Sequence, residues 1–475
     1  MSTQLGYGQG AGYPRETVAA MRRPDYRAPG TSGLRLPITW PLVLLFVAFP
    51  VWWVLGVSAF TWPVVAVPAL VALILRGRTR APVAMVLWFG FTSWVLLSGL
   101  QLESFTKITT FTYRLALYAC AGVLFLYVYN LPRTGRLDTK VLRILTVFWI
   151  IVVIGGYAGI LVGAHTFTPP VEDLLPLSLR HQAFVQELIQ PVFAEVESFL
   201  GYPVPRPAAP FTYTNEWGGN IAVLTPVAFA AIATAGRGLR RKIIIVVLIA
   251  SLVPMIVSLN RGMFLSLGGG IAYVVIRLAI RGRLGALVSL VGATSLIAVI
   301  VVLTPLGHLA AANLSSTHGH SNTTRLSVAQ QSIDGANKSP VFGYGEPQQV
   351  TGEGGTPPIG SQGQLWMVLY SNGYPATVLF IAFFLAVLWQ TRRARGITGL
   401  WLHTVPLIGL AQIAFYGWLP VELQVVMVAA ALAYRRCGQP VRPGGGARSA
   451  LTRASASPAD AVSSRRPRAL PVAAP

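Results

Sequence analysis

The chain has 475 residues, of which 53% are hydrophobic and only 11% are charged. A soluble domain is roughly 45–50% apolar and about 25% charged, so too little charge remains here to cover a soluble surface. The net charge of +22 would suggest a nucleic-acid partner in a soluble protein. However, the basic residues lie between long apolar stretches, which indicates a membrane protein and no nucleic-acid partner.

Both ends of the chain are polar and lack apolar periodicity. Residues 1–36 are rich in Gly, Tyr, Pro and Arg, and residues 438–475 form an Ala/Pro/Ser/Arg tail, so both are expected to be disordered. The first apolar run begins near Pro41 and is too long for the core of a signal peptide, which predicts a retained helix. The sequence therefore predicts an all-α transmembrane domain over residues 37–437.

Apolar stretches recur between the two tails, each close to the length of about 20 residues that a helix needs to cross the hydrocarbon core. They predict a polytopic protein with about a dozen spans. In chain order these lie at residues 40–57, 60–75, 82–100, 111–130, 142–162, 217–235, 243–259, 262–280, 284–304, 363–389, 398–416 and 419–435. The sequence shows no internal repeat and no inverted pair of broken helices of the kind found in transporters.

Lysines and arginines predict which side each loop faces, because they resist translocation and concentrate in cytoplasmic loops. With both termini in the cytoplasm, all but seven of the 37 lysines and arginines lie in the tails or at the inner side. The exceptions, on or near the outer side, are Lys107, Arg114, Arg180, Arg206, Arg261, Arg325 and Lys338. We therefore expect two cytoplasmic tails and chemistry that faces the outer side.

Two outer segments are long. Residues 163–216 carry six acids, namely Glu172, Asp173, Glu187, Glu195, Glu197 and Glu216. Apolar residues at helical spacing from Phe184 to Leu200 predict an amphipathic helix, bent at Pro191, on the outer leaflet. Residues 305–362 are rich in Gly, Pro, Ser, Thr and His, and loops of this length are usually functional or disordered.

Two outer arginines are candidates for ligand binding. Arg261 lies in the very short polar break 258–262 between two apolar spans. It either snorkels to the interface or binds a phosphate bidentately, and Asn260 and Gly262 beside it favour binding. Arg325 begins a segment whose pattern predicts a short helix that ends at a Gly-rich turn. The alternative interpretation of Arg325 is a solvated loop cation. Together, on an otherwise acidic outer surface, the two arginines fit an anionic ligand such as a lipid diphosphate.

These residues resemble a known family. The run Arg325-x(14)-Pro340-x-x-Gly343-x-Gly345, followed by the polar stretch 361–364 and by Gly373, is similar to the O-antigen ligase and polymerase superfamily. Asn260-Arg261-Gly262 stands where that family carries its other outer arginine, and Thr214-Asn215-Glu216-Trp217-Gly218 resembles actinobacterial members. The resemblance covers about residues 210–375.

The resemblance implies a metal-independent glycosyltransferase of the bacterial plasma membrane that needs no cofactor. Its partners would be a polyprenyl-diphosphate-linked glycan as donor, a glycan or lipid acceptor, and the surrounding lipids. Arg261 and Arg325 would bind the diphosphate leaving group. Asn215, Asn260 and Gln364 would line the site.

The base of the reaction is where the sequence departs from the family pattern. Ligases of the family place a histidine before the span that follows the large loop, and the best-aligned residue here is Gln362, which cannot take a proton near neutral pH. The candidates are Glu216, His308, His318 and His320, since a carboxylate or imidazole can accept the proton of an acceptor hydroxyl. Glu216 is the first choice, and its alternative role is to complement the charge of a helix N-terminus. Two loop histidines without a third ligand are weak evidence for a metal, so no metal site is expected.

The sequence thus predicts an enzyme that transfers or polymerises lipid-linked glycans in cell-surface polysaccharide synthesis. The alternative from another class is a transporter or flippase for a lipid-linked glycan or other amphiphile, and an inactive scaffold for envelope assembly is a third possibility. Transport would favour ionisable residues buried at mid-membrane. Few candidates are visible, since Arg114 and Glu422 lie near outer ends of their spans and His403 near an inner end.

Overall fold

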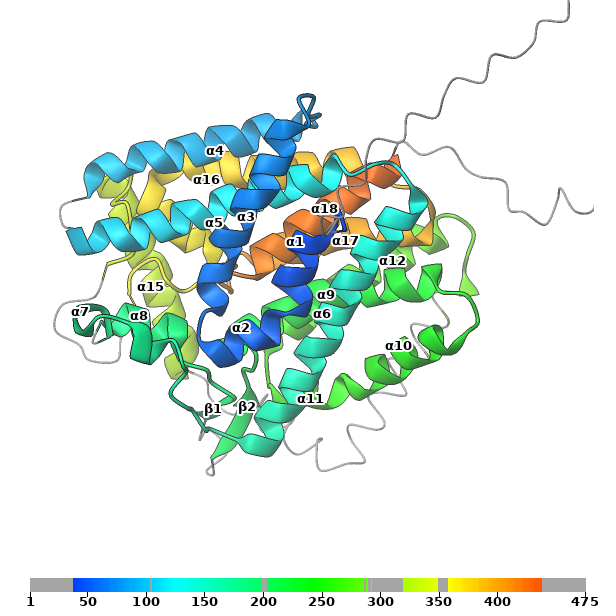
Figure 1. Ribbon diagram of the computed structural model, residues 1–475, viewed down its shortest axis with the longest axis horizontal. Helices are drawn as coiled ribbons and strands as arrows, with labels where there is room; N and C mark the ends of the chain where they lie inside the picture. Colours follow the sequence, from blue (N-terminus) through cyan, green and yellow to red (C-terminus); the bar gives the residue numbers. More distant parts are fainter. Residues whose placement is uncertain are drawn as a thin grey trace, which may run out of the picture. The chain divides into compact units, whose positions relative to one another are not determined.

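A computed structural model describes residues 37–102, 105–180, 182–197, 203–285, 288, 292, 319–348 and 358–437. This part of the chain is mostly helical (Figure 1). Its helices are α1 (Trp40–Leu42), α2 (Phe49–Leu55), α3 (Ser58–Leu75), α4 (Ala84–Ser98), α5 (Phe105–Tyr129), α6 (Gly135–Val162), α7 (Leu177–Arg180), α8 (Ala183–Ile189), α9 (Thr214–Thr234), α10 (Leu239–Ala250), α11 (Leu252–Val257), α12 (Arg261–Ala279), α15 (Gly319–Lys338), α16 (Gln364–Thr391), α17 (Gly396–Gln412) and α18 (Glu422–Cys437). The predicted span 284–304 falls almost wholly outside the described residues, as do His308 and His318.

Among the described residues, seven helical stretches are long and apolar enough to cross a membrane. They are Ser58–Leu75, Ala84–Gln101, Lys107–Tyr129, Gly135–Val162, Thr214–Thr234, Arg261–Ala279 and Gln364–Thr391. Each coincides with a predicted span to within several residues, so the polytopic all-α architecture is confirmed. The predicted spans 40–57 and 243–259 are broken helices, and 398–416 and 419–435 correspond to the shorter α17 and α18. The number twelve therefore stays a prediction.

Helix α9 forms the core of the bundle. Of the 18 residues in its most apolar stretch, 78% are buried inside the bundle. The helix packs against α6, α12, α17 and α18. Small residues permit this close packing, as in other membrane helices. Gly218 lies against Asn260 of the turn before α12, and Gly219 lies against the carboxylate of Glu422 in α18. The end of α9 that begins with Thr214 is thereby held from several sides.

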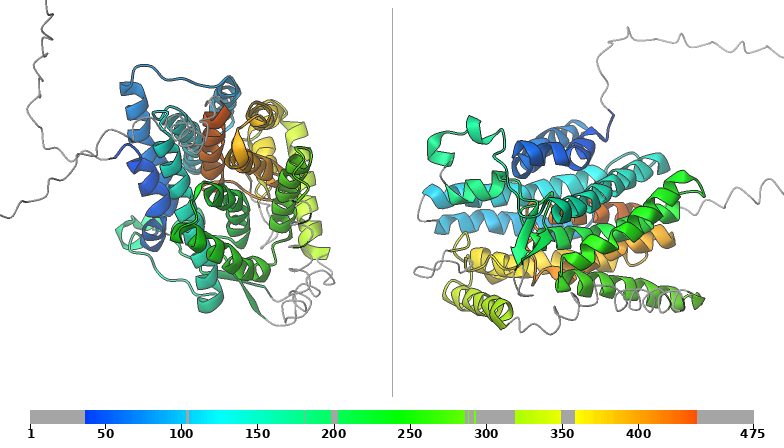
Figure 2. Two further views of the ribbon diagram at one scale, coloured as in Figure 1. Left: turned by 90° about the vertical axis from the view of Figure 1, so that its right-hand side faces the viewer. Right: turned by 90° about the horizontal axis from the view of Figure 1, so that it is seen from below.

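Helices α4, α5 and α16 lie side by side at one side of this core (Figure 2). Their contact is largely aromatic: the Trp88 ring of α4 lies 4.9 Å from that of Phe383 in α16, measured between centroids. Helix α18 packs against α5 and α16 in turn. The bundle therefore joins its N-terminal and C-terminal helices directly.

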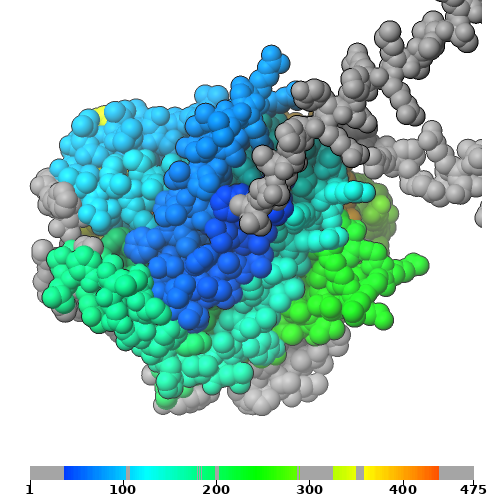
Figure 3. Space-filling view, viewed as in Figure 1, coloured from blue at the N-terminus to red at the C-terminus, as the bar shows by residue number. Residues whose placement is uncertain are grey.

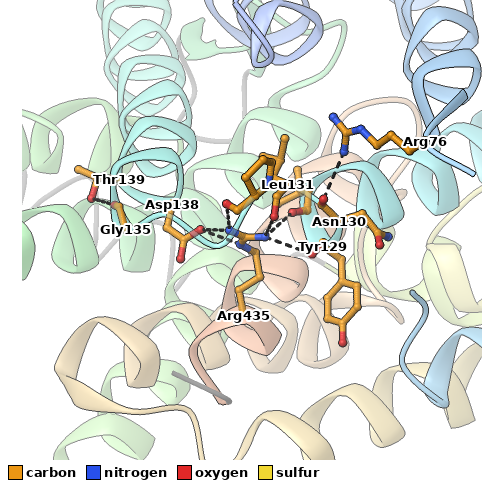
Figure 4. A network of polar contacts seen from close by, with 10 residues as sticks. Arg76, Tyr129, Asn130, Leu131, Gly135, Asp138, Thr139 and Arg435 are labelled. Atoms are coloured by element: carbon orange, nitrogen blue, oxygen red, sulfur yellow. Dashed lines mark hydrogen bonds and ion pairs between the residues drawn. The ribbon is translucent and has the colours of Figure 1, made fainter. Parts of the chain in front are cut away.

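The segments predicted to face the cytoplasm meet at one end of the bundle. There the fully buried guanidinium of Arg435 in α18 pairs with Asp138 in α6 at 2.6 Å (Figure 4). The same guanidinium donates hydrogen bonds to backbone carbonyls of residues 128, 129, 131 and 132. Arg277 of α12 donates to the carbonyl of Arg392. This clustering agrees with one common side for these loops, and which side of the membrane they face stays a prediction.

The predicted amphipathic helix from Phe184 to Leu200 is wrong for residues 190–197, and its last three residues lie outside the described residues. Helix α8 ends at Ile189, and Gln190 is extended (φ −75°, ψ 119°) because it precedes Pro191, which disfavours helical geometry. Strand β1 (Ala194–Glu197) then pairs antiparallel with β2 (Val204–Pro207). Phe193 packs edge-on against Trp53 of α2. In Figure 3, the stretch with α7 and α8 lies next to the N-terminal helices, and α8 contacts α3.

The second outer segment contains α15, which ends at the Gly-rich turn as predicted, and this turn docks into a break in α16. The break is at Gly373, whose φ of 77° and ψ of −178° are not helical. Backbone N–H groups of Tyr344 and Gly345 donate to the carbonyls of Tyr370 and Ser371, which the break leaves without helical partners. A Cβ at Gly373 would lie 2.5 Å from the carbonyl oxygen of Val341. Gly345 and Gly373, which belong to the motif that resembles the family, therefore let the backbone of the turn contact the backbone of α16. This contact fixes the position of α15.

Candidate functional site

A cavity of about 700 Å³ lies where the two outer segments meet the ends of the helices. Its walls come from α2, α3, α5, α8, the start of α9, the start of α16 and the turn between α17 and α18. Three residues predicted for the site line it: Glu216, Asn215 and Gln362. The sequence therefore identified part of one concave site, although Gln362 lies more than 140 positions from Asn215 and Glu216 along the chain.

Glu216 is placed by the first turn of α9. Its Oε2 accepts a hydrogen bond from the backbone N–H of Thr212 at 3.2 Å, so the carboxylate also caps the chain that enters the helix. Glu187 and Glu195 lie close enough to interact with it electrostatically. A carboxylate that lines a cavity and is held by the backbone has the position that a general base needs.

The polar break 258–262 is a strained turn that is anchored by its own side chains. Leu259 has a φ of 53°, which is uncommon for a residue with a side chain. Asn260 is buried, donates its Nδ2 hydrogen to the carbonyl of Thr214 at 3.2 Å, and accepts a hydrogen bond from the hydroxyl of Tyr416. Gly262 makes room for the Tyr416 ring, since a Cβ there would lie 2.6 Å from the hydroxyl oxygen. Asn260 and Gly262 thus fix the backbone on both sides of Arg261.

Arg325, Arg261 and Arg206 form an arginine cluster beside this turn. Burial lowers the pKa of the Arg325 guanidinium, the Tyr416 hydroxyl opposes that effect, and the positive charges of Arg206 and Arg261 lower the pKa further. Arg261 is the exposed first residue of α12, whereas Arg325 is half-buried on α15. Arg206 on β2 donates to the carbonyl of Ser258 at 2.8 Å and pairs with Glu197 at 3.1 Å. Two further positive charges within electrostatic range of Arg325 favour a bound anion.

Tyr416 is in contact with both the cavity and the surroundings of the arginine cluster. Its side chain lines the cavity, binds Asn260 and lies within electrostatic range of Arg325. Arg261, Arg325 and Asn260 are not among the described residues that line the cavity. The described lining thus includes Tyr416 but neither arginine, and diphosphate binding by Arg261 and Arg325 stays a prediction.

Gln364 is a structural residue here and not a lining one. It is fully buried, donates to the hydroxyl of Tyr118 at 2.7 Å, and accepts from the backbone N–H of Trp418 at 3.1 Å. It thereby connects the start of α16 to α5 and to the turn that carries Tyr416. The reason is its position inside the helix: Gln362 and Gly363 precede α16 and face the cavity, whereas Gln364 begins the helix and points into the bundle.

Several residues of the site were missed by the sequence argument. Arg206 was recognised only as an outer cation, and Tyr416 only as the end of a span. Glu187 and Glu195 were noted only as acids of the outer segment, and Glu346 was not noted. Burial raises the pKa of the Glu346 carboxyl, while the positive charges of Arg114 and Lys107 act in the opposite direction. No spacing rule predicts these neighbours, because the hairpin and the docked turn bring them together.

The geometry can be compared with known families. Residues 246–373 match the O-Antigen ligase family. The resemblance drawn from the sequence motifs is thus confirmed, and the chain is O-antigen ligase-like over this region. No curated protein matches the chain.

The O-antigen ligase-like region contains the turn with Arg261, helix α15 with Arg325, the docked Gly-rich turn and Gln362. Glu216 and Arg206 lie before it. The arginine cluster therefore combines two arginines of the matched region with one from the preceding hairpin, and the cavity combines Gln362 with Glu216. Over the matched residues, the chain is similar to membrane proteins of O-antigen ligase or polymerase type.

Proposed function

We propose that the protein is a membrane glycosyltransferase that takes a glycan from a polyprenyl-diphosphate donor and joins it to a glycan or lipid acceptor at the outer face of the plasma membrane. The observation that supports this most is the arginine cluster beside the Tyr416 wall of the cavity. A diphosphate leaving group needs positive charge next to the place where the glycosidic bond breaks. The carboxylate of Glu216 lies on the cavity side of the same wall.

The arginines and Glu216 would have different roles because their charges are opposite. Guanidinium groups bind phosphate oxygens bidentately, and they stabilise the negative charge that builds up on the leaving diphosphate. Glu216 would accept the proton of the acceptor hydroxyl as that oxygen attacks the sugar carbon. No metal ion is needed in this scheme, because the arginines provide the positive charge. Gln362 would position a substrate through its amide, since it cannot act as a base.

The test is binding of a short polyprenyl diphosphate, farnesyl diphosphate, to the purified full chain in lipid nanodiscs. Arg261→Ala and Arg325→Ala should each weaken binding by on the order of tenfold or more, since charge-assisted bonds contribute about 1.5–3 kcal/mol. Lysine at either position should restore only part of the affinity, because an ammonium lacks the bidentate fork. Arg180→Ala is the matched control, since Arg180 pairs with Glu172 in the other outer segment and does not line the cavity. Unchanged binding in both alanine variants would refute the proposed donor site.

Transport of a lipid-linked glycan is the second candidate, and one residue favours it. Glu422 of α18 is 1% exposed, and neither of its carboxylate oxygens has a hydrogen-bond partner among the described residues. Buried ionisable groups in membrane helices often mark ion or proton paths. By contrast, the buried ion pair of Asp138 and Arg435 makes several hydrogen bonds and fits a static structural role.

A reconstituted system separates the two candidates. Proteoliposomes that contain the full chain and a fluorescent lipid-diphosphate sugar should yield a larger glycan product when acceptor is present on the outside. Translocation of the labelled lipid, lost in Glu422→Gln, without any glycan product would instead support transport.

A further inference from the structure

The cavity wall is acidic. Glu187, Glu195, Glu216 and Glu346 line it from α8, β1, α9 and the turn after α15. Arg114 is the only Lys or Arg side chain among the residues described as its lining. Glu187 and Glu195 lie within electrostatic range of Glu216, so an additional negative charge beside these three carboxylates would be disfavoured.

Three of these carboxylates are already oriented by hydrogen bonds. Glu187 accepts from the hydroxyl of Tyr213 at 2.8 Å, and Glu195 accepts from the backbone N–H of Thr214 at 2.8 Å. Burial and the charge of Glu187 raise the pKa of Tyr213, which keeps its hydroxyl as the donor. An ionised carboxylate has about four lone-pair positions. Each group is thus fixed by one bond and keeps further positions for hydroxyl donors of a ligand.

Aromatic rings complete the lining. Tyr113 and Phe184 stand 6.2 Å apart between centroids, and Phe211 and Tyr213 belong to the same wall. The negative face of an aromatic ring attracts the weakly polarised C–H groups of a sugar ring. Carboxylates accept hydrogen bonds from sugar hydroxyls with the added strength of an ionised acceptor. A volume of about 700 Å³ is within the usual range for ligand sites.

We propose that this cavity binds the terminal sugars of the acceptor glycan and selects sugars that carry no negative charge, neutral or amine-bearing, against uronic or phosphorylated ones. This inference rests on the proposed function. It also assigns the two substrates to the two sides of Tyr416: the diphosphate to the arginine cluster, and the uncharged acceptor to the acidic cavity. Glu216 then faces the acceptor hydroxyl and not the phosphate.

The test uses three oligosaccharide probes of equal length: a chitin pentamer (neutral), a chitosan pentamer at pH 6 (cationic) and a pentagalacturonate (anionic). Binding to the full chain in nanodiscs is followed by saturation-transfer NMR, and by tryptophan fluorescence because Trp53 lines the cavity. The neutral and cationic probes should bind at least about tenfold more tightly than the anionic probe, as expected for a unit charge that meets several like charges at short range.

Variants link the selectivity to the cavity. Glu187→Gln and Glu195→Gln keep the side-chain size and an acceptor oxygen, and each should raise the affinity for pentagalacturonate on the order of tenfold. Asp173→Asn is the matched control, since Asp173 is an exposed acid of the same outer segment outside the cavity lining. Equal or tighter binding of the anionic probe, binding of none of the three probes, or no effect of either variant would overturn the inference. Farnesyl diphosphate binding is measured in parallel, so that a failure of the acceptor-site proposal can be distinguished from a failure of the donor-site proposal.

Discussion

Glu216 illustrates how one side chain can serve both structure and chemistry. Glu216→Gln preserves an oxygen that can accept from Thr212, but it removes the ability to take a proton. General-base assistance is typically worth a factor of about 10²–10⁴ in rate. Glycan transfer, measured by product formation in proteoliposomes, should fall by about that factor, while protein level and farnesyl diphosphate binding stay nearly unchanged.

The comparison with Gln362 decides how this result is read. Gln362→Ala should show a milder loss, because an amide positions a substrate without accepting its proton. Full activity in Glu216→Gln would leave Glu216 as a helix-terminus charge. Diphosphate departure assisted by the arginines would then have to drive the reaction, with the proton lost to solvent.

Tyr416 offers a test of the wall between the two substrates. Tyr416→Phe removes the hydrogen bond to Asn260 and leaves the ring in place. The buried amide of Asn260 then loses a partner, which costs about 1–3 kcal/mol and loosens the turn that carries Arg261. We expect weaker farnesyl diphosphate binding together with slower transfer. A loss of transfer alone, with donor affinity unchanged, would contradict a role in positioning the arginine.

At this scale the residues singled out from the sequence include Arg261, Arg325, Glu216, Gln362, Asn215 and Asn260, but not Arg206 or Tyr416. Arg261 could be found because a charged residue in a five-residue break between apolar spans is conspicuous. Arg206 could not, since its approach to Ser258 depends on the pairing of two short strands. Gln364 was predicted to line the site, but its side chain is buried against Tyr118 and the backbone of Trp418, contacts that no local pattern reveals.

Among the elements, the break in α16 is the one that positions the site. Gly373→Ala would force a Cβ into the carbonyl of Val341 and require a positive φ of 77° from a residue with a side chain. Such backbone strain costs on the order of 1–3 kcal/mol before the clash is counted. The variant should lower the apparent melting temperature in detergent, and it should weaken farnesyl diphosphate binding because α15 carries Arg325.

Gly396 provides the control for this element. It also has a positive φ, 72°, but a Cβ there would meet no atom within 4 Å. Gly396→Ala thus measures the cost of the backbone conformation alone. If both variants lose the same stability and both retain donor affinity, then the docking of the turn does not position Arg325.

The outer segments also show which elements a sequence reveals. Long apolar helices were predicted to within several residues, because their length and hydropathy are set by the membrane. The helix through Leu200 was not, since the apolar residues around Phe193 recur at a spacing that fits both a helix and a strand. Pro191 decided between them by ending α8. The docked turn was predicted as a Gly-rich turn, but its contact with α16 joins segments that no local pattern connects.

For the whole molecule, the pair of Asp138 and Arg435 joins the C-terminal helix to α5 and α6 (Figure 4). Asp138→Asn leaves a buried guanidinium without its counter-charge, and loss of one partner of such a pair costs about 3–5 kcal/mol. The apparent melting temperature should fall sharply. The double variant Asp138→Leu/Arg435→Met should be less destabilised than Asp138→Asn, because it buries no unpaired charge. A double variant that is the less stable of the two would show that the carbonyl bonds of Arg435, and not the charge pair, hold this end together.

The orientation of the whole molecule can be tested by single cysteines and a membrane-impermeant maleimide on intact cells. The natural Cys437 is replaced by Ser, whereas Cys120 is buried and can stay. Cysteines at Asp173 and Lys338 report on the two outer segments, and cysteines at Gly236 and Arg393 report on predicted inner loops; all four positions are exposed. Because all but seven of the 37 basic residues lie in the tails and predicted inner loops, the inverted topology would translocate most of this charge, which membrane insertion resists. We expect labelling at Asp173→Cys and Lys338→Cys only, and at all four after the cells are permeabilised. Labelling of Gly236→Cys or Arg393→Cys on intact cells would show that the orientation is the opposite of the predicted one. The acidic cavity, the arginine cluster and the proposed reaction would then lie at the cytoplasmic face.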